Sequence, residues 1–221
     1  MKQHLVECGV NAPASEGAIA MNVQGPSKNV NLRIDYISRT MLGNLPDLLI
    51  DLLEIASYVY CADQRLDRGT DQLSKYGENW RRSLKFLIPV RELLVWQDTE
   101  VQEALIETLG FLSDDAYSFK FRQAVAPVQP KELYFHDLID PEDEHDGVAL
   151  FSGGIDSFAG AVTDLVANGR SLTLGGHYSS TKVRNVQEHL IAELKRRGHE
   201  HRLSFIPVWV SNENVTAREY T

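Results

Sequence analysis

The residues best suited to chemistry form one turn, Ser-Gly-Gly-Ile-Asp-Ser at positions 152–157. The apolar stretch 148–151 before it predicts a short, fully apolar strand, and the apolar residues after it recur at helical spacing. Two glycines let backbone N–H groups approach a ligand closely, and the start of a helix favours an anion. Ser152 and Ser157 add hydroxyl donors suited to phosphate oxygens. The pattern therefore predicts a phosphate-binding turn.

One member of the turn, Asp156, carries a negative charge that would repel a phosphate unless a cation lies between them. We therefore expect Asp156 to be a Mg²⁺ ligand, directly or through water. The turn has neither the GxxxxGK[ST] pattern of a Walker loop nor the GxGxxG pattern of a dinucleotide-binding fold. The alternative is a polar strand–helix turn that binds nothing. The match of six consecutive residues, between a strand and a helix, argues against that alternative.

The order SGGxDS after a strand resembles the PP-loop of the adenine-nucleotide α-hydrolase superfamily, whose members cleave ATP between its α and β phosphates. The resemblance implies that the turn binds the leaving pyrophosphate together with Mg²⁺, and that Asp156 is the catalytic member. The residues implied for ATP and pyrophosphate binding are Phe151, Ser152, Gly153, Gly154, Ile155, Asp156 and Ser157.

Two longer stretches, residues 150–162 and 175–190, most resemble the 7-cyano-7-deazaguanine synthase-like proteins of bacterial anti-phage defence operons. Residues 62–72, 77–91 and 111–121 resemble them more weakly. The resemblance implies an ATP-dependent C–N ligase, related to queuosine biosynthesis, that activates a deazaguanine-type carboxylate in antiviral defence. It also implies ATP and Mg²⁺ as cofactors, with a protein acceptor or an operon-encoded protein as a further partner.

Two other functions stay open, a PP-loop ligase that modifies tRNA and a non-catalytic fragment that recruits a partner. The charge distribution bears on the first of them. Residues 147–221 hold 8 Lys/Arg and 7 Asp/Glu, so residues 1–146 hold the other 14 and 24 and carry −10, against a net charge of −9 for the whole chain. An acidic front part disfavours binding to a phosphate backbone, and we do not expect a nucleic-acid partner.

His177 and Tyr178 end a second apolar stretch, where the resemblance implies that the adenosine part of ATP binds. A half-buried histidine satisfied by backbone groups is an equal alternative for His177. In the front part, the pairs at 67–68 and 81–82 are expected to be structural charges rather than a docking surface for substrate or partner.

The elements that must position the turn alternate between short apolar strands and amphipathic helices. Strands are expected at 148–151, 171–178 and 203–210, with helices over 158–166 and 183–194 between them. Such strand–helix–strand units form parallel sheets with right-handed crossovers. An α/β fold follows, in which residues 147–221 form the first half of a Rossmann-like parallel-sheet PP-loop domain.

The front part, residues 1–136, is expected to be an α+β domain, separated from the PP-loop domain by an acidic linker at 137–146. Residues 18–25 and 30–36 are expected to form a hairpin-like pair. Further elements are expected as helices over 45–59 and 101–112 and as strands over 84–90 and 117–121.

Three strands with two helices would leave one sheet face uncovered, so we expect the chain to be a fragment of a larger protein. Zinc is expected only in a missing C-terminal region, because Cys8 and Cys61 are the two cysteines and neither belongs to a CxxC pattern. With no apolar run long enough for a membrane span and no signal peptide, the sequence predicts a cytoplasmic protein without a membrane partner.

Overall fold

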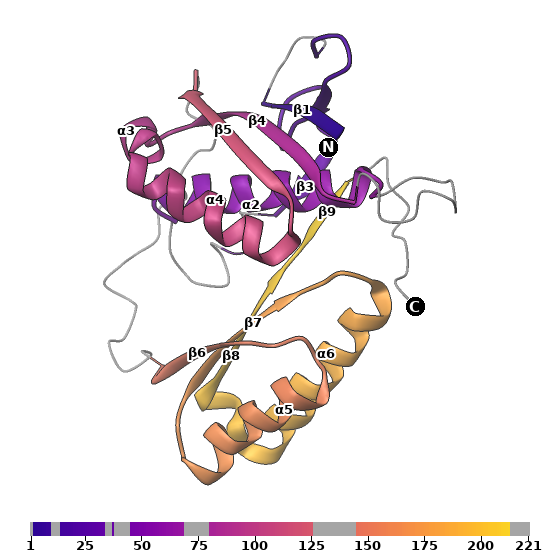
Figure 1. Cartoon of the computed structure of the whole chain (residues 1–221). Helices are drawn as coiled ribbons and strands as arrows, with labels where there is room; N and C mark the ends of the chain where they lie inside the picture. The colour runs from indigo at the N-terminus through magenta and orange to yellow at the C-terminus, as the bar shows by residue number, and fades with distance from the viewer. Residues whose placement is uncertain are drawn as a thin grey trace. The chain divides into compact units, whose positions relative to one another are not determined.

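The computed structural model describes most of the chain and divides it into two compact units (Figure 1). The described residues are 2–9, 14–33, 37, 45–68, 80–125 and 145–212. Of these, the first unit holds residues 2–9, 14–31, 46–68, 80–125 and 212, and the second unit holds residues 32–33, 37, 45 and 145–211. The fold is α/β, as the sequence predicts, and a parallel sheet, expected only for residues 147–221, is also present in the first unit. Of the linker predicted at residues 137–146, residues 137–144 lie outside the described residues.

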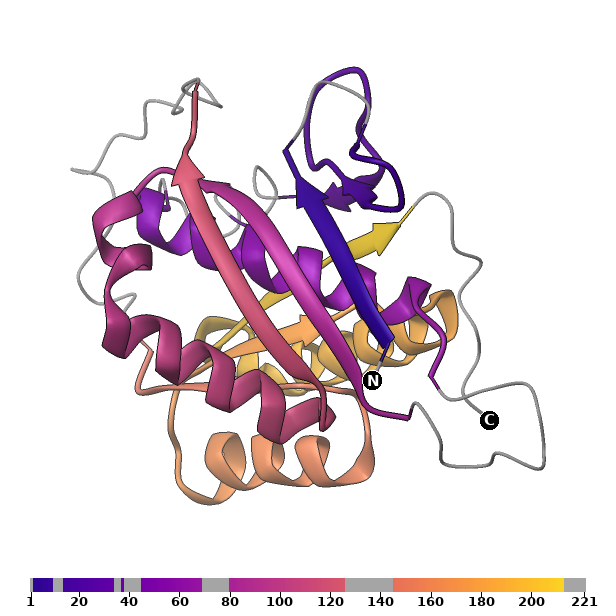
Figure 2. The same cartoon turned by 45° about the horizontal axis from the view of Figure 1, so that its top comes forward.

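The first unit is built on a four-stranded parallel sheet with the strand order β2-β1-β4-β5. Figure 2 shows β1, β4 and β5 running side by side in one direction. The strands are β1 (Lys2–Cys8), β2 (Ile19–Met21), β4 (Arg82–Val90) and β5 (Ala116–Gln123). The predicted strands at 84–90 and 117–121 are confirmed as β4 and β5.

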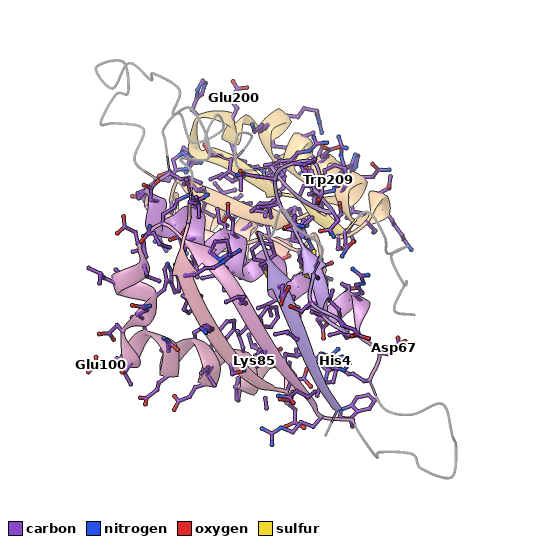
Figure 3. All side chains as sticks on the ribbon, turned by 90° about the horizontal axis from the view of Figure 1, so that it is seen from above. His4, Asp67, Lys85, Glu100, Glu200 and Trp209 are labelled. Atoms are coloured by element: carbon purple, nitrogen blue, oxygen red, sulfur yellow. The ribbon has the colours of Figure 1, made fainter. Side chains whose placement is uncertain are left out.

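Three helices, α2 (Asp47–Arg65), α3 (Leu93–Gln97) and α4 (Thr99–Ser113), belong to the same unit. In β4, Leu84, Phe86, Ile88 and Val90 are buried, whereas Lys85 is exposed. This alternation places one face of the strand against the helices and the other in solvent. Figure 3 looks onto that outer face, where Lys85 is labelled. The predicted helices over 45–59 and 101–112 are confirmed as α2 and α4.

A buried ion network joins the start of β4 to the residue before β5. Asp115 accepts hydrogen bonds from the backbone N–H of Arg82 at 2.8 Å, from Arg82 Nη2 at 2.6 Å and from Arg68 Nη2 at 2.8 Å. Asp63 at the end of α2 binds both arginines. The side chains of Asp115 and Arg82 are 0% and 1% exposed. Arg68 and Arg82 therefore have the structural role expected for the charged pairs at 67–68 and 81–82.

A second network lies at the opposite, carboxyl end of β4. Arg91 contacts Asp51 at 2.7 Å and Glu54 at 2.9 Å, and both acids lie on α2. Asp51 also accepts hydrogen bonds from the backbone N–H of Glu92 and from Trp96 Nε1. Burial raises the pKa of Glu54 despite the neighbouring Arg91 guanidinium. The two networks thus tie α2 to both ends of the central strand.

The predicted hairpin-like pair between residues 18–25 and 30–36 is wrong. β2 pairs in parallel with β1, while β3 (Val30–Leu32) forms a separate two-stranded sheet with β9 (Val210–Asn212). Residues 34–36 lie outside the described residues.

The loop between β2 and β3 has its own hydrogen bonds. Asn22 O accepts from the backbone N–H groups of Asn29 and Val30, both at 2.9 Å. Asn29 Oδ1 accepts from the backbone N–H of Asn22 at 2.8 Å. These hydrogen bonds close the loop, and the strands on either side of it pair with distant partners, β2 with β1 and β3 with β9.

The second unit contains a three-stranded parallel sheet in the order β6-β7-β8, with helices α5 and α6 on one face (Figure 1). The elements are β6 (Gly147–Leu150), α5 (Ile155–Val162), β7 (Leu172–His177), α6 (Thr181–Leu194) and β8 (Leu203–Val208). A π-helical turn, Thr163–Ala167, extends α5. The strands and helices predicted from residue 148 onward are therefore confirmed, except that the last strand ends at Val208 and Val210 begins β9, which pairs with β3.

The core of this unit lies between the sheet and its two helices. It is formed by Phe151, Ala161, Leu165, Leu172, Leu174, Ile191, Leu194 and Leu203. On β6, Val148 and Leu150 point away from this core and are 81% and 88% exposed. The sequence-based expectation of one uncovered sheet face agrees with these exposures. In the part of the chain that the structure describes, no helix combines the length and apolar character of a membrane span.

Candidate functional site

The predicted phosphate-binding turn lies between the carboxyl end of β6 and the start of α5. Phe151 is 1% exposed and donates its backbone N–H to Gly175 O at 2.7 Å, which fixes the end of the strand against β7. Gly153 has φ +80°, a left-handed conformation that side-chain-bearing residues rarely adopt. Gly154 is the N-cap of α5, so the helix begins directly after the two glycines. Strand, turn and helix thus occur in the predicted order.

Hydroxyl groups brace the turn from inside. Ser152 Oγ accepts from the backbone N–H of Gly154 at 3.2 Å and lies 3.0 Å from Ser157 Oγ. Ser157 Oγ also donates to Gly154 O at 3.0 Å. The first backbone N–H groups of α5, those of Ile155, Asp156 and Ser157, have no partner within the helix. The turn therefore places unpaired backbone donors and the Ser152 hydroxyl at the positive end of a helix dipole, a combination that binds anions.

A buried glutamine behind the turn was not identified from the sequence. Gln187 on α6 is 0% exposed, and its Nε2 donates to Phe151 O at 2.9 Å and to His177 O at 3.4 Å. A Cβ on Gly153 would lie only 3.0 Å from Gln187 Cγ. One amide thus joins the ends of β6 and β7 and packs against the glycine turn. The available signal was a polar residue at helical spacing between Val183 and Ile191, inside the apolar stripe of α6.

Asp156, the predicted metal ligand and catalytic residue, lies in the first turn of α5 with an exposed side chain. Among the described residues, no group of three or more His, Cys, Asp or Glu side chains could hold a metal ion. A Mg²⁺ bound with a nucleotide needs only one or two carboxylates, because phosphate oxygens and water complete its coordination. A single accessible carboxylate beside an anion-binding turn fits that requirement.

His177 and Tyr178 lie at the carboxyl end of β7, next to β8. Tyr178 donates its backbone N–H to Val208 O at 2.9 Å and its hydroxyl to Glu188 Oε1 at 3.1 Å. His177 is half-buried, and burial lowers its pKa while a hydrogen bond with the backbone of Val210 opposes that shift. The backbone partner of the half-buried ring favours the structural alternative for His177. Tyr178 keeps an aromatic ring at the edge of the sheet where ligands of α/β proteins bind.

The structure thus joins the ends of β6 and β7 through Gln187, and with them the turn and the predicted adenosine residues. Two further residues at this edge, Arg184 and Trp209, were not singled out from the sequence. Both have ring contacts with Tyr178, and no linear motif links their positions. Comparison of the chain with known proteins finds no matching family model, no similar curated protein and no similar solved structure.

Proposed function

We propose that this chain binds ATP at the β6–α5 turn and acts as part of an adenylating ligase of the 7-cyano-7-deazaguanine synthase-like type. The reaction would activate a deazaguanine-type carboxylate and release pyrophosphate, in bacterial anti-phage defence and in the cytoplasm. The observation that carries the proposal is the turn itself. Gly153 at φ +80°, two bracing serines and the unpaired start of α5 converge at the carboxyl edge of a parallel sheet.

In this proposal, a carboxylate oxygen of the substrate attacks the α-phosphorus of ATP. The bond between the α-phosphorus and the bridging oxygen breaks, and the electron pair leaves with pyrophosphate. Ser152, Ser157 and the first backbone N–H groups of α5 bind the leaving pyrophosphate and stabilise its charge. Their fixed positions reduce the entropy lost on reaching the transition state.

Asp156 would hold Mg²⁺, which neutralises charge on the phosphates when it is bound. Without a cation, the carboxylate of Asp156 would repel the phosphates that the same turn attracts. Tyr178 would contact the adenosine part of ATP, and His177 would support the strand end rather than the nucleotide.

The direct test is pyrophosphate release by the chain with Mg²⁺, ATP and 7-carboxy-deazaguanine. Asp156→Asn removes the charge with little change of shape, and we expect it to lower release at least tenfold. Glu200→Gln is the matched control, because Glu200 is an exposed carboxylate of the same unit and contacts only His201 among the described residues. Unchanged release by Asp156→Asn would contradict the role of the turn.

A further inference from the structure

Four side chains of the second unit gather beside the carboxyl ends of β7 and β8. Tyr178 follows β7, Trp209 follows β8, Arg184 lies in the first half of α6, and Arg33 follows β3. The Tyr178 and Trp209 rings meet edge to face, with centroids 6.0 Å apart. We call these four residues the ring platform, and Trp209 is labelled in Figure 3.

Both arginines lie over the aromatic rings. The Arg33 guanidinium is 5.0 Å from the centroid of Trp209. The Arg184 guanidinium is 5.6 Å from the same centroid and 5.5 Å from that of Tyr178. Two cations within 6 Å of one indole form an unusual concentration of positive charge, since cation–π contacts of this kind occur only about once in 70–80 residues.

Within the described part of the chain, the carboxylate of Glu188 offsets part of this charge. Glu188 Oε1 lies 2.9 Å from Arg184 Nε and also accepts the Tyr178 hydroxyl. Among the described residues, no carboxylate pairs with Arg33, so the platform with Glu188 carries a net charge of +1. The Arg184 side chain is 42% exposed and Arg33 is exposed as well. The platform thus combines accessible cations with aromatic surface, which suits a planar anion.

We infer that two residues of the ring platform bind an aromatic carboxylic acid, with its planar ring against Trp209 and its acid group paired to Arg33, while Tyr178 is left to the adenosine part of ATP. This assignment rests on the proposed function, in which such an acid is the second substrate. The base of ATP is neutral, and the charge of the nucleotide lies on phosphates that the β6–α5 turn accommodates. An aromatic acid instead carries its charge on a group attached to the ring that stacks, so both Arg33 and the Trp209 ring contribute to its binding. Parallel sheets bind their ligands at this same carboxyl edge.

Isothermal titration calorimetry on the full chain tests the inference with 7-carboxy-deazaguanine and the corresponding amide, which keeps the ring and removes the charge. Arg33→Met should weaken binding of the acid about tenfold or more and leave binding of the amide unchanged. Trp209→Ala should weaken binding of both compounds. Arg196→Met is the matched control, because the Arg196 side chain is 70% exposed in the helical turn that follows α6, and it should change neither affinity.

Equal affinity of the acid for the native chain and Arg33→Met would overturn the inference, as would displacement of the acid by ATP alone. Circular dichroism checks that each variant folds, and Arg33→Lys, which keeps the charge, should restore most of the affinity. Failure of the proposed function has a different signature. In that case neither Mg²⁺-ATP binding nor pyrophosphate release is observed, whether or not the acid binds the platform.

Discussion

At the scale of single residues, Gly153 is the position on which the candidate site most depends. Its φ of +80° excludes most side chains, and a Cβ there would also lie 3.0 Å from Gln187 Cγ. The two constraints have different origins, since one is local to the backbone and the other comes from α6. Gly169 offers a comparison, because it has φ +65° but its nearest atom to a built Cβ is 3.9 Å away.

We expect Gly153→Ala to lower the free energy of unfolding of the second unit by about 2 kcal/mol and to abolish Mg²⁺-ATP binding. Gly169→Ala should cost about 1 kcal/mol, because it carries the backbone strain without the contact, and should leave nucleotide binding intact. Urea unfolding and calorimetry measure the two effects. Equal losses of nucleotide affinity in both variants would show that the close packing of Gly153 is irrelevant.

Gln187 permits a second prediction at this scale. Gln187→Met keeps the length of the side chain but leaves the carbonyls of Phe151 and His177 without its Nε2 donor. We expect a loss of about 1–3 kcal/mol of stability and weaker Mg²⁺-ATP binding, because the end of β6 is no longer tied to β7. Asn185→Met, on the exposed side of α6, serves as control. Thermal unfolding and calorimetry compare the two, and unchanged nucleotide binding in Gln187→Met would exclude a positioning role.

At the scale of elements, the contact between β4, β5 and α2 depends on Asp115. Burial alone would raise the pKa of this carboxyl, but hydrogen bonds from Arg82 and the charges of Arg82 and Arg68 hold it below its usual value of 3.8. A lowered folded-state pKa stabilises the fold above pH 3.8, and this stabilisation is lost as the pH falls through the folded-state pKa.

We therefore expect Asp115→Asn to destabilise the first unit by about 3–5 kcal/mol near neutral pH, because the buried Arg82 guanidinium then faces a neutral amide instead of the Asp115 carboxylate. The difference in the free energy of unfolding between the native chain and the variant should become smaller as the pH falls below 3.8. Glu103→Gln on α4 is an exposed control that should follow the native chain. Urea unfolding across the acidic range measures all three, and a difference independent of pH would contradict the ionised state of Asp115.

At the scale of the whole molecule, each of the two units has its own core. Phe86 in the first unit and Leu174 in the second are both 0% exposed. We expect two thermal transitions, one for each unit. Phe86→Ala should lower the midpoint of the first unit's transition and Leu174→Ala that of the second unit's. Each substitution should reduce the free energy of unfolding of its own unit by about 3–5 kcal/mol. Differential scanning calorimetry resolves the transitions. A single transition that both variants shift alike would contradict separate unfolding.

How far the sequence predicts this molecule differs between the two units. In the second unit, short apolar strands alternate with helices, and the predicted order is confirmed because each element carries its own periodicity. In the first unit, β1 was not predicted, although Val6 and Cys8 are fully buried. Charged and polar residues interrupt its pattern, and its place in the sheet depends on distant partners. Long-range pairing also determines the partners of β2 and β3. The turn signals between them had predicted that they would pair with each other in one hairpin.

The candidate site follows the same division. The turn at 152–157 was predicted because its residues are contiguous and their chemistry is local. Gln187 and Trp209 were not predicted, because their roles arise only when α6 and the end of β8 lie beside the ends of other strands. A polar residue within an apolar helix stripe is a usable signal, whereas a lone tryptophan after a strand is not.

The pairing of β1 with β4 has a consequence for how the chain reaches this structure. Lys2 lies opposite Arg82, so the two inner strands of the sheet come from segments separated by the loop after β1, β2, β3 and the whole of α2. During synthesis, β1 must wait until β4 has left the ribosome before it gains its inner neighbour. Nonlocal parallel pairing of this kind slows folding and prolongs the exposure of strand edges. The first unit is therefore expected to fold slowly and to benefit from chaperones while its amino-terminal strand is unpaired.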